Sequence, residues 1–285
     1  MKELSKIDLK EKVAVITGGA GELCRLFSEV LADCGAKVAI LDIRKDAAEF
    51  LANKITKKGG NAIGIEANVL EHKSLMEAEK ILKKKFGLCN ILINGAGGNH
   101  PKGTTTNEYF TLEDLDSEKK DIITFFDLKQ KGIEFVFDLN FLGTLLTTQV
   151  FAKHMINQKN GVIINISSMN AFTPLTKIPA YSAAKAAVSN FTQWLAVYFS
   201  KVGIRVNAIA PGFFLTEQNR ALLTNENGSL TNRAQKILNM TPMGRFGTPE
   251  ELIGTLLWLI DEKASSFVNG VIIPVDGGFS AYSGV

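Results

Sequence analysis

The sequence is poor in cysteine, which rules out several architectures at once. It has three cysteines in 285 residues, Cys24, Cys34 and Cys89, an odd number without the spacing of metal ligands. A disulfide framework and a cysteine-based metal site are therefore excluded, and we expect no bound metal. Reduced thiols of this kind are typical of a cytoplasmic protein.

The sequence also lacks an excess of charge of one sign. Lys and Arg total 32 against 29 for Asp and Glu, a formal net charge of +3, and no basic stripe is interleaved with aromatic residues. Nucleic acid is therefore not an expected partner. No apolar run approaches the roughly 18 residues of a membrane helix, and residues 1–12 lack the apolar core of a signal peptide. We expect no membrane partner.

What the sequence does contain fits one domain spanning residues 1–285. Hydrophobic residues make up 46% and charged residues 21%, enough for the core of a single α/β domain. Strand patterns lie near 12–17, 37–42, 61–66, 89–93, 162–167, 204–209 and 271–274, and helical patterns near 71–86, 133–157, 180–200 and 249–260. Their alternation predicts a doubly wound parallel sheet of about seven strands with helices on both faces.

A glycine-rich turn stands between the first predicted strand and the first helical pattern. It reads Gly18-Gly19-Ala20-Gly21, and glycines there let the backbone approach a pyrophosphate at a helix N-terminus. The next strand ends at Asp42, where a carboxylate can accept hydrogen bonds from ribose hydroxyls. Because that charge repels a 2′-phosphate, we expect NAD rather than NADP. Arg44 keeps NADP open, since it could pair with the phosphate or be an ordinary solvated charge.

A second group of residues is suited to acid–base chemistry. Tyr181 and Lys185 lie four residues apart, so a helix places both side chains on one face. A nearby ammonium lowers the pKa of a phenol from its usual value of roughly 10. Ser168, at the end of a β-branched run, could hold a carbonyl or alcohol oxygen against that phenol. Together the three predict a hydride-transfer site, although the Tyr–Lys spacing alone also fits a partly solvated helix face.

These features occur in the order found in the short-chain dehydrogenase/reductase family, which the chain resembles from about residue 8 to residue 280. Thr17-Gly18 resembles the start of the family's cofactor loop, and Asn94-Gly95-Ala96-Gly97 resembles its N-x-A-G turn. Pro211-Gly212 with Thr216 resembles the segment that closes over the nicotinamide. The resemblance implies an NAD(P)-binding Rossmann fold. It also implies four catalytic residues, Asn140, Ser168, Tyr181 and Lys185. Among them, Asn140 would help a water-linked proton path reach the lysine.

The resemblance further implies a cofactor site built from the glycine-rich turn and the ends of several strands. Its residues are Gly18, Gly19, Gly21, Glu22, Leu23, Asp42, Ile43, Asn68, Val69, Asn94, Gly95, Ala96, Tyr181, Lys185, Pro211, Gly212, Phe214 and Thr216. The chain departs from the family's loop at Glu22 and Cys24, which stand where the family has glycines. Cysteine is small enough for close helix–strand packing, whereas Glu22 suits the helix dipole but not a neighbouring phosphate. Asn68 replaces a customary aspartate and should still bond the adenine.

Two polar segments, near 98–131 and 213–243, interrupt the alternation of strands and helices after the carboxyl ends of strands, where doubly wound sheets bind ligands. The candidate substrate residues are His100, Lys102, Ser168, Asn170, Tyr181, Gln218 and Arg220. This polar and partly cationic set predicts an anionic, hydroxylated small molecule, because an arginine fork binds both oxygens of a carboxylate. Singly, Lys102 and Arg220 could equally be surface charges, and Asn170 could be a turn residue.

The openings of these two segments resemble the fructuronate reductase, or D-mannonate oxidoreductase, branch of the family. That branch implies interconversion of D-fructuronate and D-mannonate with NAD(H). Another sugar, a polyol or a 3-oxoacyl substrate stays open, because one scaffold serves many substrates; a module that binds NAD without turnover is a further alternative. The family usually forms dimers or tetramers, so we expect a homodimer or homotetramer.

Overall fold

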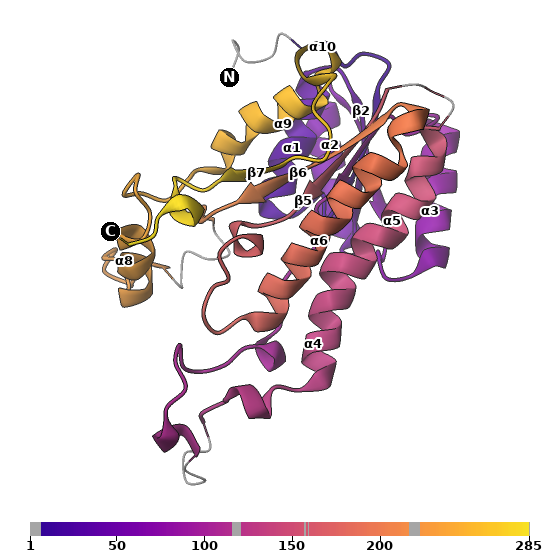
Figure 1. The fold of residues 1–285 in the computed structure, drawn as a ribbon. Coiled ribbons are helices and arrows are strands. Elements are labelled where there is room, and N and C mark those ends of the chain that lie inside the picture. Colours follow the sequence, from indigo (N-terminus) through magenta and orange to yellow (C-terminus); the bar gives the residue numbers. More distant parts are fainter. Residues whose placement is uncertain (1–6, 116–120, 157, 159, 217–222, 285) are drawn as a thin grey trace.

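Seven parallel strands form one sheet through the centre of the molecule (Figure 1). The computed structural model describes residues 7–115, 121–156, 158, 160–216 and 223–284. The strands are β1 Val13–Thr17, β2 Lys37–Asp42, β3 Asn61–Glu66, β4 Ile91–Asn94, β5 Gly161–Ile166, β6 Ile204–Pro211 and β7 Ile272–Val275. Their order across the sheet is β3-β2-β1-β4-β5-β6-β7. The predicted doubly wound parallel sheet is confirmed.

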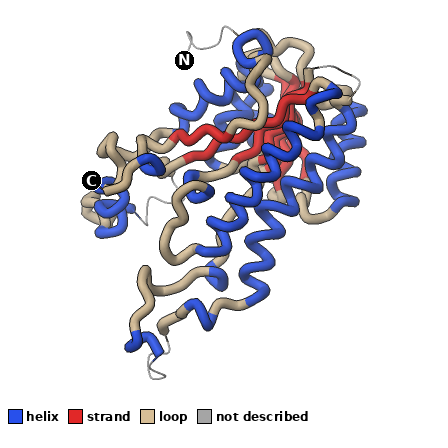
Figure 2. The backbone as a smooth tube through the Cα atoms, in the orientation of Figure 1, coloured by secondary structure: helices blue, strands red, loops and turns tan. Residues whose placement is uncertain are grey.

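Helices cover both faces of the sheet because the side chains of each strand alternate between two apolar layers. Ala14 and Ile16 of β1 pack in one core cluster with α1, α2 and α9, whereas Val13 and Val15 pack in a second cluster with α3, α5 and α6. Figure 2 shows the blue helices on either side of the red strands. The helices of the described part of the chain are α1 Glu22–Asp33, α2 Lys45–Lys57, α3 His72–Lys85, α4 Gln130–Phe137, α5 Gly143–Phe151, α6 Pro179–Tyr198, α8 Asn232–Asn239, α9 Ile253–Ile260 and α10 Glu262–Ser265.

One helical run continues from Gln130 to His154 through α4, a π-helical turn at Asp138–Leu142, and α5. Its 25 residues are long and apolar enough to cross a bilayer by length and composition, so the expectation that no stretch approaches membrane length is wrong. Half of its most apolar window is buried, and α5 packs against α3 and β4. Core helices of globular domains have the same composition, since they are apolar on several sides.

The carboxyl ends of β1, β4, β5 and β6 lie along one edge of the sheet, and the direction of strand addition reverses between β1 and β4. Doubly wound sheets bind ligands at such a reversal. Both interrupting segments leave from this edge, and both contain helices that the sequence pattern did not predict. The first holds short 3₁₀ helices at Pro101–Gly103, Leu112–Leu115 and Phe125–Asp127, and the second holds α8. The first segment projects beyond the start of α4 (Figure 1).

Candidate active site

Ser168, Tyr181 and Lys185 come together at the carboxyl end of β5 and the start of α6. Ser168 is buried, and its hydroxyl accepts the N–H of Asn170 at 3.2 Å as the N-cap of a 3₁₀ turn. The same hydroxyl is hydrogen-bonded to the Tyr181 phenol. The Lys185 ammonium nitrogen lies 5.6 Å from the centroid of the Tyr181 ring. The fold therefore places the serine hydroxyl, the phenol and the ammonium next to one another, as the sequence predicted.

Burial sets the protonation of this group. It raises the pKa of the Tyr181 phenol above its usual value, and the hydrogen bond with Ser168 opposes that effect. Burial also lowers the pKa of Lys185 to about 8, with Cys24 acting in the opposite direction. The expectation that the pKa of Tyr181 lies below its usual value is thus wrong, because burial dominates. The phenol packs in an apolar cluster with Val136, Ala180 and Ala184, and this desolvation outweighs the hydrogen bond with Ser168.

Asn140 and Lys185 converge on the turn that follows β4. A Cβ added at Gly97 would lie 2.7 Å from the Asn140 Oδ1 and 3.2 Å from the Lys185 Nζ. Asn140 donates to the carbonyls of Gly98 and Val136 at 2.7 Å and accepts the Gly98 N–H at 3.2 Å. It stands in the π-helical turn, a distortion frequent at functional sites. The amide thus fixes the turn beside the ammonium, and Lys185 itself donates to the Ile166 carbonyl at 2.8 Å.

The glycine-rich turn forms a narrow cradle at the start of α1. Gly18 has a φ of 60°, and a Cβ there would lie 3.0 Å from the backbone of Ala96, so glycine is required on both grounds. The Thr17 hydroxyl accepts the N–H groups of Gly95 and Ala96 at 3.2 and 3.3 Å, which ties this turn to the one after β4. Gly21 is the N-cap of α1. Glycine has no side chain that could cap the helix, so the N-terminal end of α1 is suited to bind a phosphate.

Cys24 fills the space that a glycine leaves open in the family's loop. A Cβ at Gly95 would lie 2.2 Å from the Cys24 sulfur, so the thiol packs directly on the turn after β4. Close packing of the helix against the strand is therefore retained, as predicted. Burial raises the pKa of the Cys24 thiol to about 12, with Lys185 opposing. The thiol stays protonated and unreactive, so it has a packing role here.

Asp42 ends β2 with a buried carboxylate that faces the glycine-rich turn. Its Oδ2 accepts the Ala20 N–H at 3.2 Å, and its Oδ1 accepts the backbone N–H of Arg44 at 3.0 Å. The Arg44 guanidinium also pairs with this carboxylate, at 3.1 Å from Nε to Oδ1. Arg44 is therefore neither a free surface charge nor an unengaged phosphate ligand, because its charge is directed at Asp42.

Several other predicted cofactor residues form hydrogen bonds or packing contacts within the chain. Asn68 caps the turn before α3, with its Oδ1 accepting the Leu70 N–H at 3.1 Å and its amide donating to Glu71 at 2.8 Å. Asn94 donates to Thr148 at 3.0 Å and Asn165 at 2.8 Å. Ile43 is exposed beside Asp42, Val69 is buried against Gly143, and Phe214 is buried in the core. Contact of these side chains with a cofactor stays a prediction.

The predicted substrate residues that the structure describes lie around the start of α6. His100 accepts the Lys102 N–H through Nδ1 at 3.1 Å, and its ring lies 5.0 Å from that of Phe135. A Cβ at Gly103, next to the exposed Lys102, would lie 3.7 Å from the Ala180 side chain, adjacent to Tyr181. Asn170 is buried, and its Oδ1 has no hydrogen-bond partner within the described part of the chain. Gln218 and Arg220 lie outside the described residues.

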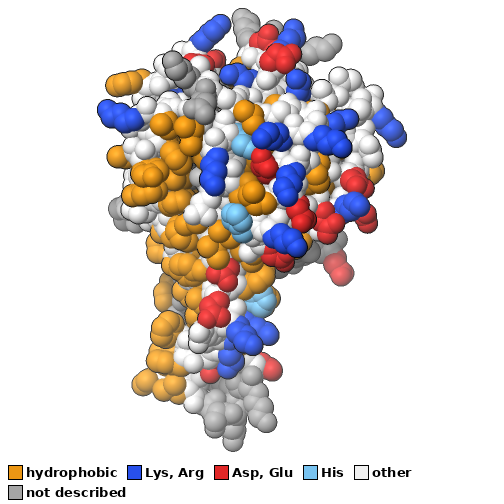
Figure 3. Space-filling view, turned by 90° about the vertical axis from the view of Figure 1, so that its right-hand side faces the viewer, with side chains coloured by type: hydrophobic (Ala, Val, Ile, Leu, Met, Phe, Trp, Pro, Cys, Tyr) orange, Lys and Arg blue, Asp and Glu red, His pale blue; other side chains and the backbone are white. Residues whose placement is uncertain are grey.

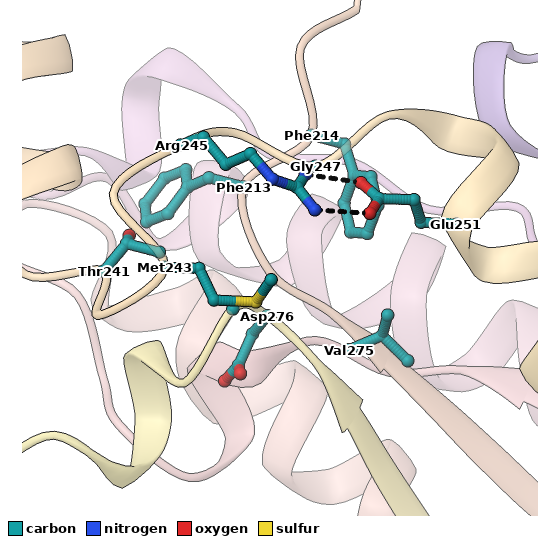
Figure 4. Close-up of a pocket in the computed structure, with 10 residues that line it drawn as sticks. Phe213, Phe214, Thr241, Met243, Arg245, Gly247, Glu251, Val275 and Asp276 are labelled. Atoms are coloured by element: carbon teal, nitrogen blue, oxygen red, sulfur yellow. Dashed lines mark hydrogen bonds and ion pairs between the residues drawn. The ribbon is translucent and has the colours of Figure 1, made fainter.

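A small cavity of about 90 Å³ separates the second segment from the end of β7 (Figure 4). Its rim is fixed by Arg245, whose guanidinium binds both carboxylate oxygens of Glu251 at 2.7 and 2.8 Å. That ion pair and the Thr248 N–H lower the pKa of Glu251 to about 2. The sequence analysis did not identify the Arg245–Glu251 ion pair. The sequence pattern that could have pointed to Glu251 is the capping box Thr248-Pro249-Glu250-Glu251, which has the S/T-x-x-E pattern of a helix start.

An ion pair joins the two interrupting segments to each other. The Lys236 ammonium of α8 lies 3.0 Å from the nearer carboxylate oxygen of Glu108, which belongs to the first segment. Lys236, Lys177 and Arg233 together lower the pKa of Glu108. These residues are far apart in the sequence and follow no motif, so only the folded chain shows that the two segments meet.

Comparison with known proteins agrees with this geometry. A family profile described as short chain dehydrogenase matches residues 12–227. An uncharacterized oxidoreductase of Haemophilus influenzae is 59% identical over 278 residues, covering 98% of this chain and 96% of that protein. An uncharacterized oxidoreductase of Bacillus subtilis is 50% identical over 278 residues, covering 98% of both. A crystal structure from Haemophilus influenzae with bound NAD, provisionally described as a D-mannonate oxidoreductase, has a TM-score of 0.95 and 58% identity over 99% of each chain.

Proposed function

The chain belongs to the short-chain dehydrogenase family, and from this we propose that it interconverts a secondary alcohol and a ketone with NAD(H), acting on D-mannonate and D-fructuronate. The observation that carries the chemistry is the contact of the Ser168 hydroxyl and the Tyr181 phenol beside the buried Lys185. The substrate is supported by the likeness to the structure provisionally described as a D-mannonate oxidoreductase. Residues 1–285 act as one NAD-binding domain in this proposal.

Each catalytic residue has one task. Tyr181 gives its proton to the carbonyl oxygen in reduction and takes it back from the alcohol in oxidation. Ser168 holds that oxygen by hydrogen bonding, and the Lys185 ammonium stabilises negative charge on the phenol. Asn140 holds the Gly97–Gly98 turn against Lys185 through three hydrogen bonds, and organises the proton path to the lysine. Raised by burial, the Tyr181 pKa keeps the phenol protonated at neutral pH, as the reductive direction requires.

The cofactor residues fit a dinucleotide. The glycine cradle leaves space for a pyrophosphate at the start of α1, and Asp42 offers buried carboxylate oxygens to ribose hydroxyls. Bound nicotinamide supplies or accepts the hydride. NAD is favoured over NADP because the Asp42 charge opposes a 2′-phosphate and holds the Arg44 guanidinium.

Replacing Asp42 should reverse the cofactor preference. Asp42→Ser replaces the charged carboxylate acceptor with a shorter neutral hydroxyl and frees Arg44 for a 2′-phosphate, so we expect the dissociation constant for NADH to rise about 10- to 100-fold. Binding of NADPH should tighten. Fluorescence titration with both cofactors measures this, and Asp46→Ser is the control because it removes an exposed carboxylate from the same region. An unchanged NADH-to-NADPH ratio in Asp42→Ser would show that the carboxylate does not select the cofactor.

The polar rim suits an anionic polyol. The unpartnered Asn170 Oδ1 can accept a substrate hydroxyl, since a buried amide oxygen without a hydrogen bond is costly. His100, with Nδ1 already accepting, can donate through Nε2. Lys102 supplies positive charge for a carboxylate, and the sequence-based assignment of Gln218 and Arg220 stays part of the same proposal.

The direct test is the initial rate of NADH oxidation with D-fructuronate, beside NADPH and uncharged keto-sugars. We expect turnover with fructuronate and NADH, and a Lys102→Ala variant with an approximately tenfold higher KM for fructuronate but not for an uncharged ketone. Turnover confined to uncharged ketones would retain the chemistry and reject the sugar-acid substrate. Turnover only with NADPH would reject the cofactor assignment.

The proposal also includes the cellular compartment and the oligomeric state of the protein. The three cysteines are free and buried, in keeping with a reducing cytoplasm. Self-association as a homodimer or homotetramer is part of the proposal, as is common in this family.

A further inference from the structure

The helical run from Gln130 to His154 buries polar side chains where a surface helix would bury apolar ones. Its outer side exposes Phe135 and Leu142, and Figure 3 shows a band of hydrophobic side chains running from the body onto the projecting part. The threonines of α5, in contrast, are between 0% and 5% exposed: Thr144, Thr147 and Thr148. Because amphipathic helices normally turn their apolar stripe toward the core, these buried hydroxyls call for a physical explanation.

Two of these hydroxyls form a ladder along the helix that ends at Asn140. The Thr148 hydroxyl donates to the Thr144 carbonyl at 2.7 Å, and the Thr144 hydroxyl donates to the Asn140 carbonyl at 2.8 Å. The other end of the ladder is tied to the sheet, because the Asn94 amide of β4 donates to the Thr148 hydroxyl at 3.0 Å. The Thr147 hydroxyl, in contrast, has no hydrogen-bond partner within the described residues.

The ladder ends in the π-helical turn Asp138–Leu142. There the Gly143 N–H donates to the carbonyl of Asp138, five residues back, so the turn holds one residue more than a regular α-helical turn. Threonine hydroxyls that bond to the carbonyl four residues back bend a helix. The Thr144 hydroxyl makes such a bond to Asn140 inside the widened turn, and thereby adds a hydrogen bond where the regular backbone pattern is interrupted.

The contacts of Asn140 depend on the widened turn. Its amide crosses from the helix to the turn after β4, where it bonds to the carbonyl and the N–H of Gly98. Loss of the extra residue from the π-helical turn would rotate one part of the helix against the other by about 100°, and Asn140 would leave Gly98. Because a Cβ at Gly97 would meet both the Asn140 Oδ1 and the Lys185 Nζ, this shift would also change the surroundings of the ammonium.

We infer that Thr144 is a positioning residue for the reaction, whose hydroxyl holds the π-helical turn in the form that directs Asn140 at the turn beside Lys185. The inference rests on the proposed function, because the roles of Asn140 and Lys185 give this position its catalytic consequence. Thr144 takes no part in proton transfer and acts through Asn140. Thr148 and Asn94 support it by fixing α5 against β4.

Hydrogen exchange of the full chain tests the positioning without any substrate. The Gly98 N–H is bonded to the Asn140 side chain, so Thr144→Val, which keeps the shape of the side chain and removes its hydroxyl, should speed exchange in peptides containing Gly98 about fivefold to tenfold. Mass spectrometry measures this rate. Thr147→Val is the matched control, because it removes a buried hydroxyl without a partner from the same helix, and it should exchange as the wild type does at Gly98.

Steady-state rates test the catalytic consequence, with any ketone that the wild type reduces. Thr144→Val should lower kcat about fivefold to tenfold, with the KM for the ketone and the dissociation constant for NADH close to the wild-type values, because the hydroxyl aligns Asn140 and binds neither ligand. Thr144→Ser retains the donor and should recover most of the rate. Thr144→Ala is a second variant without the hydroxyl, which keeps the test open if Thr144→Val folds poorly, and it should show the same loss of kcat.

A double-mutant cycle tests whether Thr144 acts through Asn140. In an Asn140→Ala background the amide is already absent, so the further change Thr144→Val should leave kcat unaltered. Thr147→Val should leave kcat unaltered in both backgrounds.

The outcomes separate the positioning from the function. Faster exchange at Gly98 together with a loss of kcat that disappears in the Asn140→Ala background supports the inference. Faster exchange in a protein whose wild type reduces no ketone would reject the proposed function and retain the positioning of Asn140 by Thr144. Unchanged exchange at Gly98, a full further loss of kcat in the Asn140→Ala background, or equal losses in Thr144→Val and Thr147→Val would each overturn the inference.

Discussion

Tyr181→Phe should reduce turnover by about 10²- to 10⁴-fold, the usual contribution of a positioned acid–base group. The substitution keeps the ring in its cluster with Val136, Ala180 and Ala184 but removes the transferable proton and the hydrogen bond to Ser168. Because the ring remains, NADH should bind within a few-fold of the wild-type affinity. Steady-state rates with fructuronate and NADH fluorescence titration measure the two quantities separately.

Tyr198→Phe provides the matched control for that substitution. It removes a phenol hydroxyl from the same helix, at the other end of α6 and about 25 Å along the axis. Its turnover should equal that of the wild type. Near-normal turnover in Tyr181→Phe would mean that another group supplies the proton, and equal losses in both variants would point to damage of the helix.

Ketone reduction should lose rate as pH rises through about 8, because Lys185 loses its charge there. Burial lowers the pKa of this ammonium to about 8, so the group is charged below that pH and neutral above it. The neutral amine cannot stabilise negative charge on the Tyr181 oxygen, whose own pKa is raised. The reductive rate should therefore be flat below about pH 8 and fall above it. Lys185→Ala should lower turnover about 10²-fold or more at neutral pH.

The pH profile of Lys185→Arg tests whether loss of the positive charge at position 185 causes the alkaline decline in rate. A guanidinium keeps its proton throughout the accessible range, so the residual activity of this variant should lack the alkaline decline. Stopped-flow or steady-state rates from pH 6 to 10 in one mixed buffer measure the profile. A wild-type rate that stays constant to pH 10, or an unchanged decline in Lys185→Arg, would assign the titration to a different group.

The sequence by itself determined the sheet and the positions of the chemical groups. Short apolar runs such as Val13–Thr17 and Gly161–Ile166 became buried parallel strands, since burial on both faces needs continuous apolar residues. The spacing of Tyr181 and Lys185 likewise fixed their common face on α6. The sequence also placed Gly18 in a tight turn at the start of the first helix, and its φ of 60°, which disfavours other residues, agrees with that placement.

Only the tertiary structure decided the properties that depend on neighbours from distant parts of the chain. The pKa values of Tyr181 and Lys185 follow from burial beneath α4 and the turn after β4, so spacing alone gave the wrong direction for the tyrosine. The engagement of Arg44 by Asp42 and the Glu108–Lys236 pair are also contacts without a sequence pattern. Local patterns specify secondary structure because they repeat along the chain, whereas desolvation and ion pairing depend on which surfaces the fold brings together.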